Sequence, residues 1–176
     1  MQRKKLFIFG LSIILSLSFI PFTTSADSII SNEKIENIEA DCDSIKTTLK
    51  RIQNADRNTR VSIGRSFQSI LTDFITPLNV RLVKNNAFNS ELADIQNNYA
   101  NAREDFNRDY ISYSQEFETL LSINCKEEPE HFYDQLEKTR EKRNVVSESV
   151  KRLQSIVDEH VKAVETLRDS LKGNNE

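Results

Sequence analysis

The side chains best suited to bind a metal or to act as nucleophiles are few in this sequence, which has two histidines and two cysteines. On a single helix His131 and His160 would lie about 43 Å apart, so they cannot share a metal ion. Glu128 and His131 have the Glu-x-x-His spacing of di-iron helical bundles, but the pair occurs once and encloses Pro129. His160 falls in an apolar pattern, where we expect it half-buried and hydrogen-bonded. We therefore expect no metal site and no cofactor.

The sequence also lacks the motifs of common catalytic sites, with no glycine-rich phosphate loop, no Gly-x-Ser-x-Gly and no His-Glu-x-x-His. Its paired acidic residues, Asp41 with Asp43 and Glu127 with Glu128, fall at expected helix ends, where nothing suits a solvated carboxylate to acid–base catalysis. We predict that the protein is not an enzyme and has no catalytic residue.

The first 26 residues have the organisation of a secretory signal peptide. A basic start at residues 3–5 precedes the apolar run 6–20, and Pro21 and the small residues 23–26 follow, so cleavage is expected before Asp27. An uncleaved membrane anchor is the alternative, because the run reaches the short limit of about 17 residues for a membrane span. We expect a secreted or periplasmic protein with no stable membrane insertion after cleavage.

Composition narrows the class of protein further. Without residues 1–26 the chain keeps 21 basic and 27 acidic residues, a formal charge of −6, whereas the whole chain carries −3. A field of that sign disfavours nucleic acid and anionic lipid as partners. Residues 27–176 hold only two glycines and two prolines, which leaves little room for sheets and tight turns.

Apolar residues recur at alternating steps of three and four along three stretches, the pattern of helices that pack along a narrow seam. The first seam consists of Ile35, Ile38, Cys42, Ile45, Leu49, Ile52, Asp56, Thr59, Ile63, Phe67, Ile70 and Phe74. The second consists of Phe88, Leu92, Ile95, Tyr99, Ala102 and Phe106, then, after an offset of one residue, Tyr110, Tyr113, Phe117 and Leu120. The third consists of Phe132, Leu136, Thr139, Arg143, Val146, Val150, Leu153, Val157, His160, Val164, Leu167 and Leu171. We predict helices over about residues 30–75, 78–124 and 130–172.

Two prolines mark the expected breaks between these helices. Thr76 before Pro77 suits an N-cap followed by the first helical residue, where the missing N–H of proline has no partner to lose. Pro129 is expected to begin the third helix in the same way. For residues 78–89 two interpretations remain open: they begin the second helix, or they form a connection with a turn at Asn85–Asn86.

Seams this narrow are not stable alone in water, so the helices must pack on one another. Short connections make neighbouring helices antiparallel, which predicts an all-α, elongated three-helix bundle or coiled coil in up-down-up order. We expect one domain over residues 27–172 and a polar tail at 173–176.

The two cysteines fit this arrangement. When the first two helices fold back about a corner near residues 82–84, Cys42 comes level with Cys125. In an exported chain with two cysteines we expect a disulfide between them. The alternative is a pair of inert thiols.

The same register brings two charged residues of the apolar seams, Asp56 and Arg143, within about a turn of each other. We predict a buried polar layer halfway along the rod, joined by Tyr110 or Tyr113, of the kind that fixes helix register. The alternative is that both side chains extend to solvent.

Apolar residues are densest around the first corner, more so than a two-position seam requires. We predict a partner-binding tip formed by Phe74, Leu78, Val80, Leu82, Val83 and Phe88. The alternative is that these side chains only cap the end of the bundle.

These patterns favour an exported, non-enzymatic helical protein that acts as an interaction module or structural spacer, with a protein partner or self-association. Two alternatives remain. A holdase-type chaperone requires exposed apolar grooves between splayed helices, and a small-ligand carrier requires a cavity inside the bundle beside Ala100 and Ala102.

Overall fold

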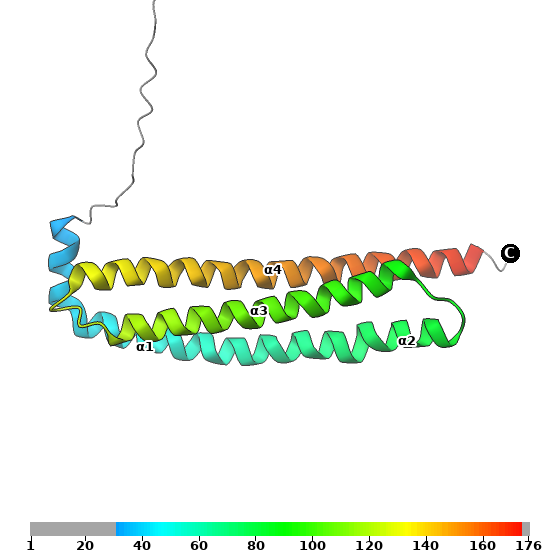
Figure 1. Ribbon diagram of the computed structural model, residues 1–176, viewed down its shortest axis with the longest axis horizontal. Helices are drawn as coiled ribbons and strands as arrows, with labels where there is room; N and C mark the ends of the chain where they lie inside the picture. Colours follow the sequence, from blue (N-terminus) through cyan, green and yellow to red (C-terminus); the bar gives the residue numbers. More distant parts are fainter. Residues whose placement is uncertain (1–30, 174–176) are drawn as a thin grey trace, which may run out of the picture.

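The computed structural model describes residues 31–173. The predicted signal segment and the last three residues lie outside this range. Every regular element of the described part is a helix (Figure 1), so the all-α prediction is confirmed. The elements are α1 (Asn32–Ser69), the π-helical turn η1 (Ile70–Ile75), α2 (Thr76–Lys84), α3 (Ser90–Ser122) and α4 (Pro129–Gly173). None of the described helices is long and apolar enough to cross a membrane.

The helices form an up-down-up rod, as predicted. α1, η1 and α2 follow one another without a break, α3 returns beside them, and α4 runs back along α3 (Figure 1). One end of the rod holds the connection between α3 and α4, and we call it the proximal end. The other holds the connection between α2 and α3, and we call it the distal end.

The predicted boundary between the first two helices at residues 75–78 is wrong, because residues 76–84 continue the first helix as α2. The turn at Asn85–Asn86, part of the second interpretation of residues 78–89, is confirmed. Asn86 adopts a left-handed φ of 55°, which asparagine tolerates better than most residues. The N–H of Ala87 donates to Leu82 O at 2.9 Å and that of Asn86 to Val83 O at 3.1 Å, which closes the end of α2. The Asn89 side chain then caps α3 by accepting from the N–H of Leu92 at 2.9 Å.

The helix continues through Pro77 because of the π turn that precedes it. Thr76 has helical backbone angles, φ −62° and ψ −45°, so it is not the predicted N-cap, and its N–H donates to Leu71 O five residues earlier. In a regular α-helix the proline ring would clash with a carbonyl of the preceding turn. The wider turn of η1 moves those carbonyls, and the proline is accommodated at the start of α2.

The extra residue of the π turn also changes which side chain faces the core. The seam predicts that Phe74 points inward, but Phe74 is 65% exposed and its neighbour Ile75 is 1% exposed. A π turn shifts the residues after it by one position relative to an α-helical repeat. Phe74 is therefore turned out to solvent, and Ile75 takes the expected core position.

The core lies mainly between α3 and α4, which pack against each other more extensively than either packs against α1. Fully buried large side chains include Leu92, Tyr99, Phe106 and Leu120 of α3 and Phe132 and Leu153 of α4. By contrast, the buried residues of α1 are limited to Ile38, Cys42, Leu49 and Phe67. Small buried residues such as Ala102 and Ala163 allow the backbones to approach closely. The continuous helix formed by α1, η1 and α2 is thus held less firmly than the α3–α4 pair.

The proximal end is closed by a disulfide. Cys42 and Cys125 are bonded, with their Cα atoms 5.6 Å apart, so the predicted disulfide is confirmed. Lys126 donates to Asp43 at 2.7 Å beside it, and this lysine lowers the pKa of the Asp43 carboxyl by hydrogen bonding. Figure 1 shows the first turns of α1 running across this end rather than along the rod. There the Lys34 ammonium lies 5.4 Å from the centroid of the Tyr133 ring of α4.

The distal end is less complete. α3 has 33 residues and α4 has 45, so α4 outruns its neighbour by about 18 Å at 1.5 Å per residue. Figure 1 shows residues 85–89 looping from the end of α2 to the start of α3, which falls short of the ends of α2 and α4. The last turns of α2 and α4 therefore lack a third helix between them.

Candidate functional site

The histidines lie far apart along α4 and have different surroundings. His131 is exposed at the proximal start of the helix, where its Nδ1 lies 3.0 Å from the Glu128 carboxylate. His160 is half-buried, as expected, but its buried Nε2 has no hydrogen-bond partner among the described residues. Burial lowers the pKa of His160 below its usual value. Residues 31–173 contain no group of three metal-ligating side chains.

Asp56, Tyr113 and Arg143 meet halfway along the rod and come from α1, α3 and α4. The Arg143 Nε and Nη2 atoms each donate to the Asp56 carboxylate at 3.1 Å, a bidentate geometry. The Tyr113 hydroxyl donates to Asp56 Oδ2 at 2.6 Å. One carboxylate therefore links all three helices at one level, and Tyr110 packs edge-on against Tyr113.

This polar layer is more open than the sequence predicts. The Asp56 side chain is 20% exposed, but that of Arg143 is 59% exposed, so the pair lies at the edge of the core. Two partners are charged and the third is a neutral phenol, whose pKa is raised by burial and then by the hydrogen bond to Asp56. Hydrogen bonding to Asp56 likewise raises the pKa of Arg143. None of these shifts brings a group near neutral pH, so the layer suits helix registration rather than proton transfer.

The six residues predicted to form a binding tip divide into two groups. Leu78 and Leu82 are half-buried and pack against the core cluster that includes Ile75, Leu92 and Leu153. The other four are exposed, namely Phe74 at 65%, Val80 at 46%, Val83 at 57% and Phe88 at 67%. Phenylalanine side chains are mostly buried in folded proteins, so two exposed ones at the same end of the rod make that end a candidate interaction surface.

Two open hollows flank α2 at the distal end. The first, of about 510 Å³, lies between η1–α2 and α4 and includes Phe74, Leu78 and Val161 in its lining. The second, of about 370 Å³, lies between α2 and the start of α3 and includes Val80, Val83 and Phe88. We call the exposed apolar residues Phe74, Val80, Val83, Phe88 and Val161 the distal surface.

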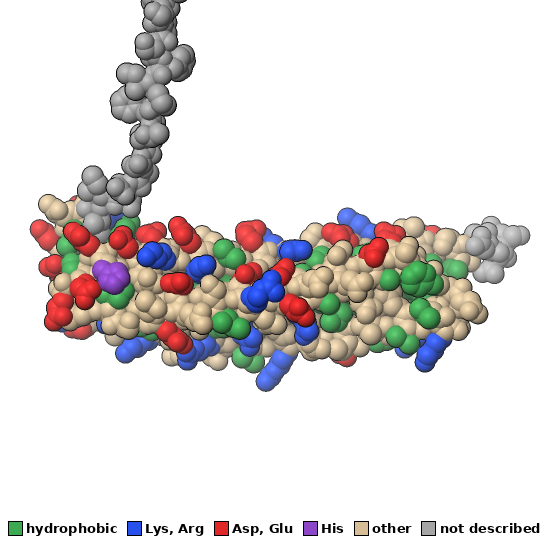
Figure 2. Space-filling model, in the orientation of Figure 1, with side chains coloured by type: hydrophobic (Ala, Val, Ile, Leu, Met, Phe, Trp, Pro, Cys, Tyr) green, Lys and Arg blue, Asp and Glu red, His purple; other side chains and the backbone are tan. Residues whose placement is uncertain are grey.

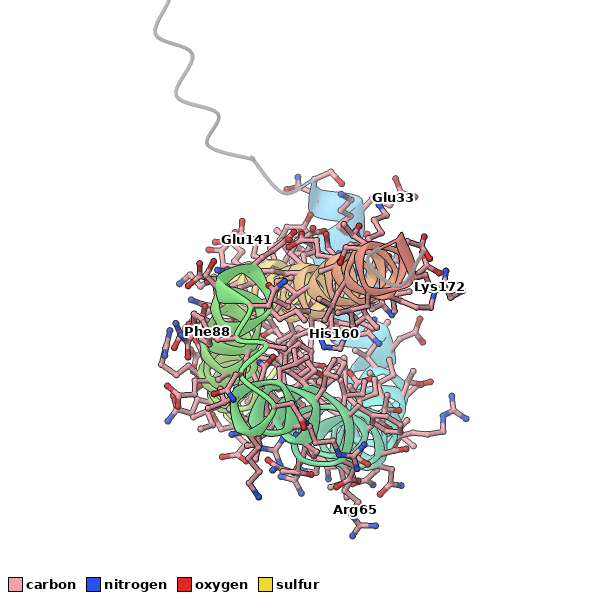
Figure 3. The ribbon with its side chains drawn as sticks, turned by 90° about the vertical axis from the view of Figure 1, so that its right-hand side faces the viewer. Glu33, Arg65, Phe88, Glu141, His160 and Lys172 are labelled. Atoms are coloured by element: carbon pink, nitrogen blue, oxygen red, sulfur yellow. A yellow bond between two sulfur atoms is a disulfide. The ribbon has the colours of Figure 1, made fainter. Side chains whose placement is uncertain are left out.

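Figures 2 and 3 show how the two ends differ. Acidic side chains crowd the proximal end in Figure 2, whereas hydrophobic side chains appear in larger groups toward the distal end. Figure 3 looks along the rod from the distal end, and His160 is directed into the space between α4 and the continuous helix formed by α1, η1 and α2. Phe88 lies at the left edge of that view, just before the start of α3.

Sequence reasoning missed Val161 and the outward turn of Phe74. Val161 is 49% exposed and lies across the first hollow from Phe74. Val161 lies four residues after Val157 and three before Val164, both of the third seam, and this spacing was a signal that the apolar face of α4 widens there. Of the two small residues beside which a ligand carrier requires a cavity, Ala102 is packed in the core and Ala100 is half-buried.

Comparisons of the chain with models of protein families, with curated proteins and with solved structures found no match in any of the three. The function is therefore argued from the residues of this chain alone.

Proposed function

We propose that the protein is an exported, non-enzymatic helical rod that binds a partner protein through its distal surface. The observation that carries the proposal is the exposure of Phe74, Val83 and Phe88 where α3 stops short of its neighbours. Fully burying an aromatic or aliphatic side chain of this kind contributes about 1.5–3 kcal/mol. A partner that covers several of them gains enough for specific binding.

Two features support export. The N-terminal segment has the organisation of a signal peptide, and the Cys42–Cys125 disulfide is typical of proteins from oxidising compartments. The disulfide lies at the proximal end, away from the distal surface. It stiffens the rod where the core is closed and leaves the distal residues accessible to a partner.

The contrast between the two ends favours a protein partner over a role as a simple spacer. A spacer requires stable helices but gains nothing from exposed aromatic residues, which carry a risk of aggregation. The distal surface consists of apolar residues flanked by polar ones such as Asn79 and Lys84, and a polar rim around an apolar centre is typical of protein interfaces.

Affinity capture with two matched double variants tests this proposal. Phe74→Glu with Val83→Lys alters the distal surface without changing net charge. Ile111→Glu with Val145→Lys introduces the same two charged residues at apolar positions that are 53% and 46% exposed on the sides of the rod. We expect the wild type and the Ile111/Val145 variant to retain the same partner from the native medium or envelope, and the Phe74/Val83 variant to lose it.

Equal retention of the partner by both variants, with helicity verified by circular dichroism, would show that the distal surface is not the binding site. Light scattering on the wild type separates a partner from self-association. A molecular mass of twice the chain, lost only in the Phe74/Val83 variant, would assign the same surface to a second copy instead.

A further inference from the structure

A third hollow, of different chemistry, lies between α1 and α3, halfway along the rod. It has a volume of about 300 Å³, and its lining includes Arg60, Arg65 and Arg103 but no acidic residue. No residue of α4 or of the distal surface takes part. We call it the arginine pocket.

The three arginines have few partners in the described chain, and the Arg60 guanidinium lies 5.2 Å from the centroid of the Tyr110 ring. No ion pair joins any of them to another residue within 31–173, although other arginines of the rod, such as Arg57 and Arg143, do form ion pairs. The partly buried Arg60 and Arg103 and the exposed Arg65 thus line one hollow of a protein whose formal net charge is −3. Like charges at partly buried positions repel one another, and an anion bound between them would offset that repulsion.

The hydrogen bonding of these arginines is also incomplete. The Arg60 Nη2 donates to the amide oxygen of Asn107 at 3.3 Å, and the Arg103 Nη1 donates to that of Gln68. Each guanidinium has five N–H donors, and the buried Nε atoms of Arg60 and Arg103 have no acceptor among the described residues. Neutral amide oxygens accept single hydrogen bonds and do not balance the charge.

Gly64 leaves space in the same hollow. It lies within α1, where glycine costs about 1 kcal/mol relative to alanine. Neither a left-handed backbone nor close packing requires a glycine here, because its φ is not positive and a Cβ would meet nothing within 4 Å. Its missing side chain widens the pocket beside the arginines. Figure 3 shows Arg65 extending from α1 into solvent.

We propose that the arginine pocket binds the phosphate or carboxylate group of a small organic anion. Guanidinium groups bind such oxyanions through short, charge-assisted hydrogen bonds. The volume of about 300 Å³ is at the lower end of small-molecule sites and larger than a single phosphate group requires. Phe106 and Val61 supply an apolar wall for the rest of the ligand. The site is independent of the distal surface, so either proposal can fail without the other.

Binding of inorganic phosphate, phenyl phosphate and benzoate, measured by calorimetry on the whole mature protein at constant ionic strength, tests the proposal. We expect phenyl phosphate to bind more tightly than inorganic phosphate, because its ring reaches the apolar wall. The benzoate arm distinguishes a carboxylate from a phosphate ligand. Arg60→Gln and Arg103→Gln should each weaken binding about tenfold or more, whereas Arg51→Gln, an exposed arginine of α1 outside the pocket, should leave it unchanged.

Gly64→Leu provides a second variant that keeps all the arginines and fills the hollow, and it should abolish binding of phenyl phosphate while circular dichroism remains that of the wild type. Absence of binding of all three anions to the wild type would overturn the proposal. Equal weakening by Arg51→Gln and Arg103→Gln would also overturn it, because it would indicate attraction to the surface charge alone.

Discussion

Removing the Cys42–Cys125 disulfide should loosen α1 before it loosens α3 and α4. The bond closes a loop with a sequence separation of 83 residues. The chain-entropy relation for a loop of this size gives about 4.5 kcal/mol, and native disulfides of small exported domains contribute about 2–5 kcal/mol. For a chain of this length, a loss of about 4.5 kcal/mol corresponds to a fall in Tm of about 9–18 °C.

The structure indicates where that stability acts. α3 and α4 keep their mutual packing when the bond is absent, because their buried side chains interlock along the rod. α1 has few buried residues, and two of its contacts at the proximal end are the disulfide and the Asp43–Lys126 ion pair, which is exposed to solvent. An exposed ion pair contributes little. The proximal half of α1 should therefore open locally.

Urea unfolding followed by circular dichroism, together with hydrogen exchange, measures both effects. The Cys42→Ser/Cys125→Ser variant is compared with the oxidised wild type, and reductant added to the variant is the control that should change nothing. A loss below about 1 kcal/mol would refute the estimate from the loop size. A gain of exchange spread evenly over the three helices would refute the view that α1 depends most on the bond.

Four further predictions follow from single residues. Gly64→Ala should raise the unfolding free energy by about 0.5–1 kcal/mol, measured by urea unfolding, because the new methyl group meets open space. Asp56→Asn should lower it by about 1–2 kcal/mol, since Tyr113 and Arg143 both lose a charged acceptor. Burial raises the pKa of Tyr99 to about 12. The unfolding free energy should therefore fall as pH rises from 10 toward 12, because the unfolded chain loses the tyrosine proton first. Unfolding measured across that interval should show a smaller fall for Tyr99→Phe. Burial lowers the pKa of His160 below its usual value of 6.5. The unfolding free energy of the wild type should therefore fall as pH drops below 6.5, because the unfolded chain binds the proton more tightly. The difference between the unfolding midpoints at about pH 8 and about pH 5 should be smaller for His160→Leu than for the wild type.

The helices and their order were predictable because they depend on local periodicity. Each seam repeats over many residues, and an error at one position does not change the outcome. The disulfide was predictable for a related reason, since the rise per residue places Cys42 level with Cys125 once the helices are antiparallel. The same register brought Asp56 and Arg143 together.

The distal corner was harder to predict because two local signals conflict there. A proline such as Pro77 often occupies the first position of a helix, and an asparagine pair such as Asn85–Asn86 often forms a turn. Both were recognised, but the sequence alone does not show that a π turn lets the helix pass the proline. Phe74 and Ile75 are adjacent apolar residues, and only the phase after that turn decides which of them is buried.

The arginine pocket was not predictable from the sequence. Arg60 and Arg65 belong to one helix and Arg103 to another, and none of them interrupts a seam as Asp56 and Arg143 do. Their meeting depends on the rotation of α1 against α3, and their lack of acidic partners depends on the positions of all the neighbouring carboxylates. His160 shows the same limit, since its seam position predicts burial but not the missing partner of Nε2.

Site-specific photo-crosslinking in the cells that produce the protein tests the role of the distal surface most directly. A photoreactive phenylalanine analogue replaces Val83 in one variant and Ile111 in another, two exposed apolar positions on different parts of the rod. The proposal predicts one discrete crosslinked partner from position 83 and none from position 111. Crosslinks from position 111 alone, or the same product from both positions, would contradict it.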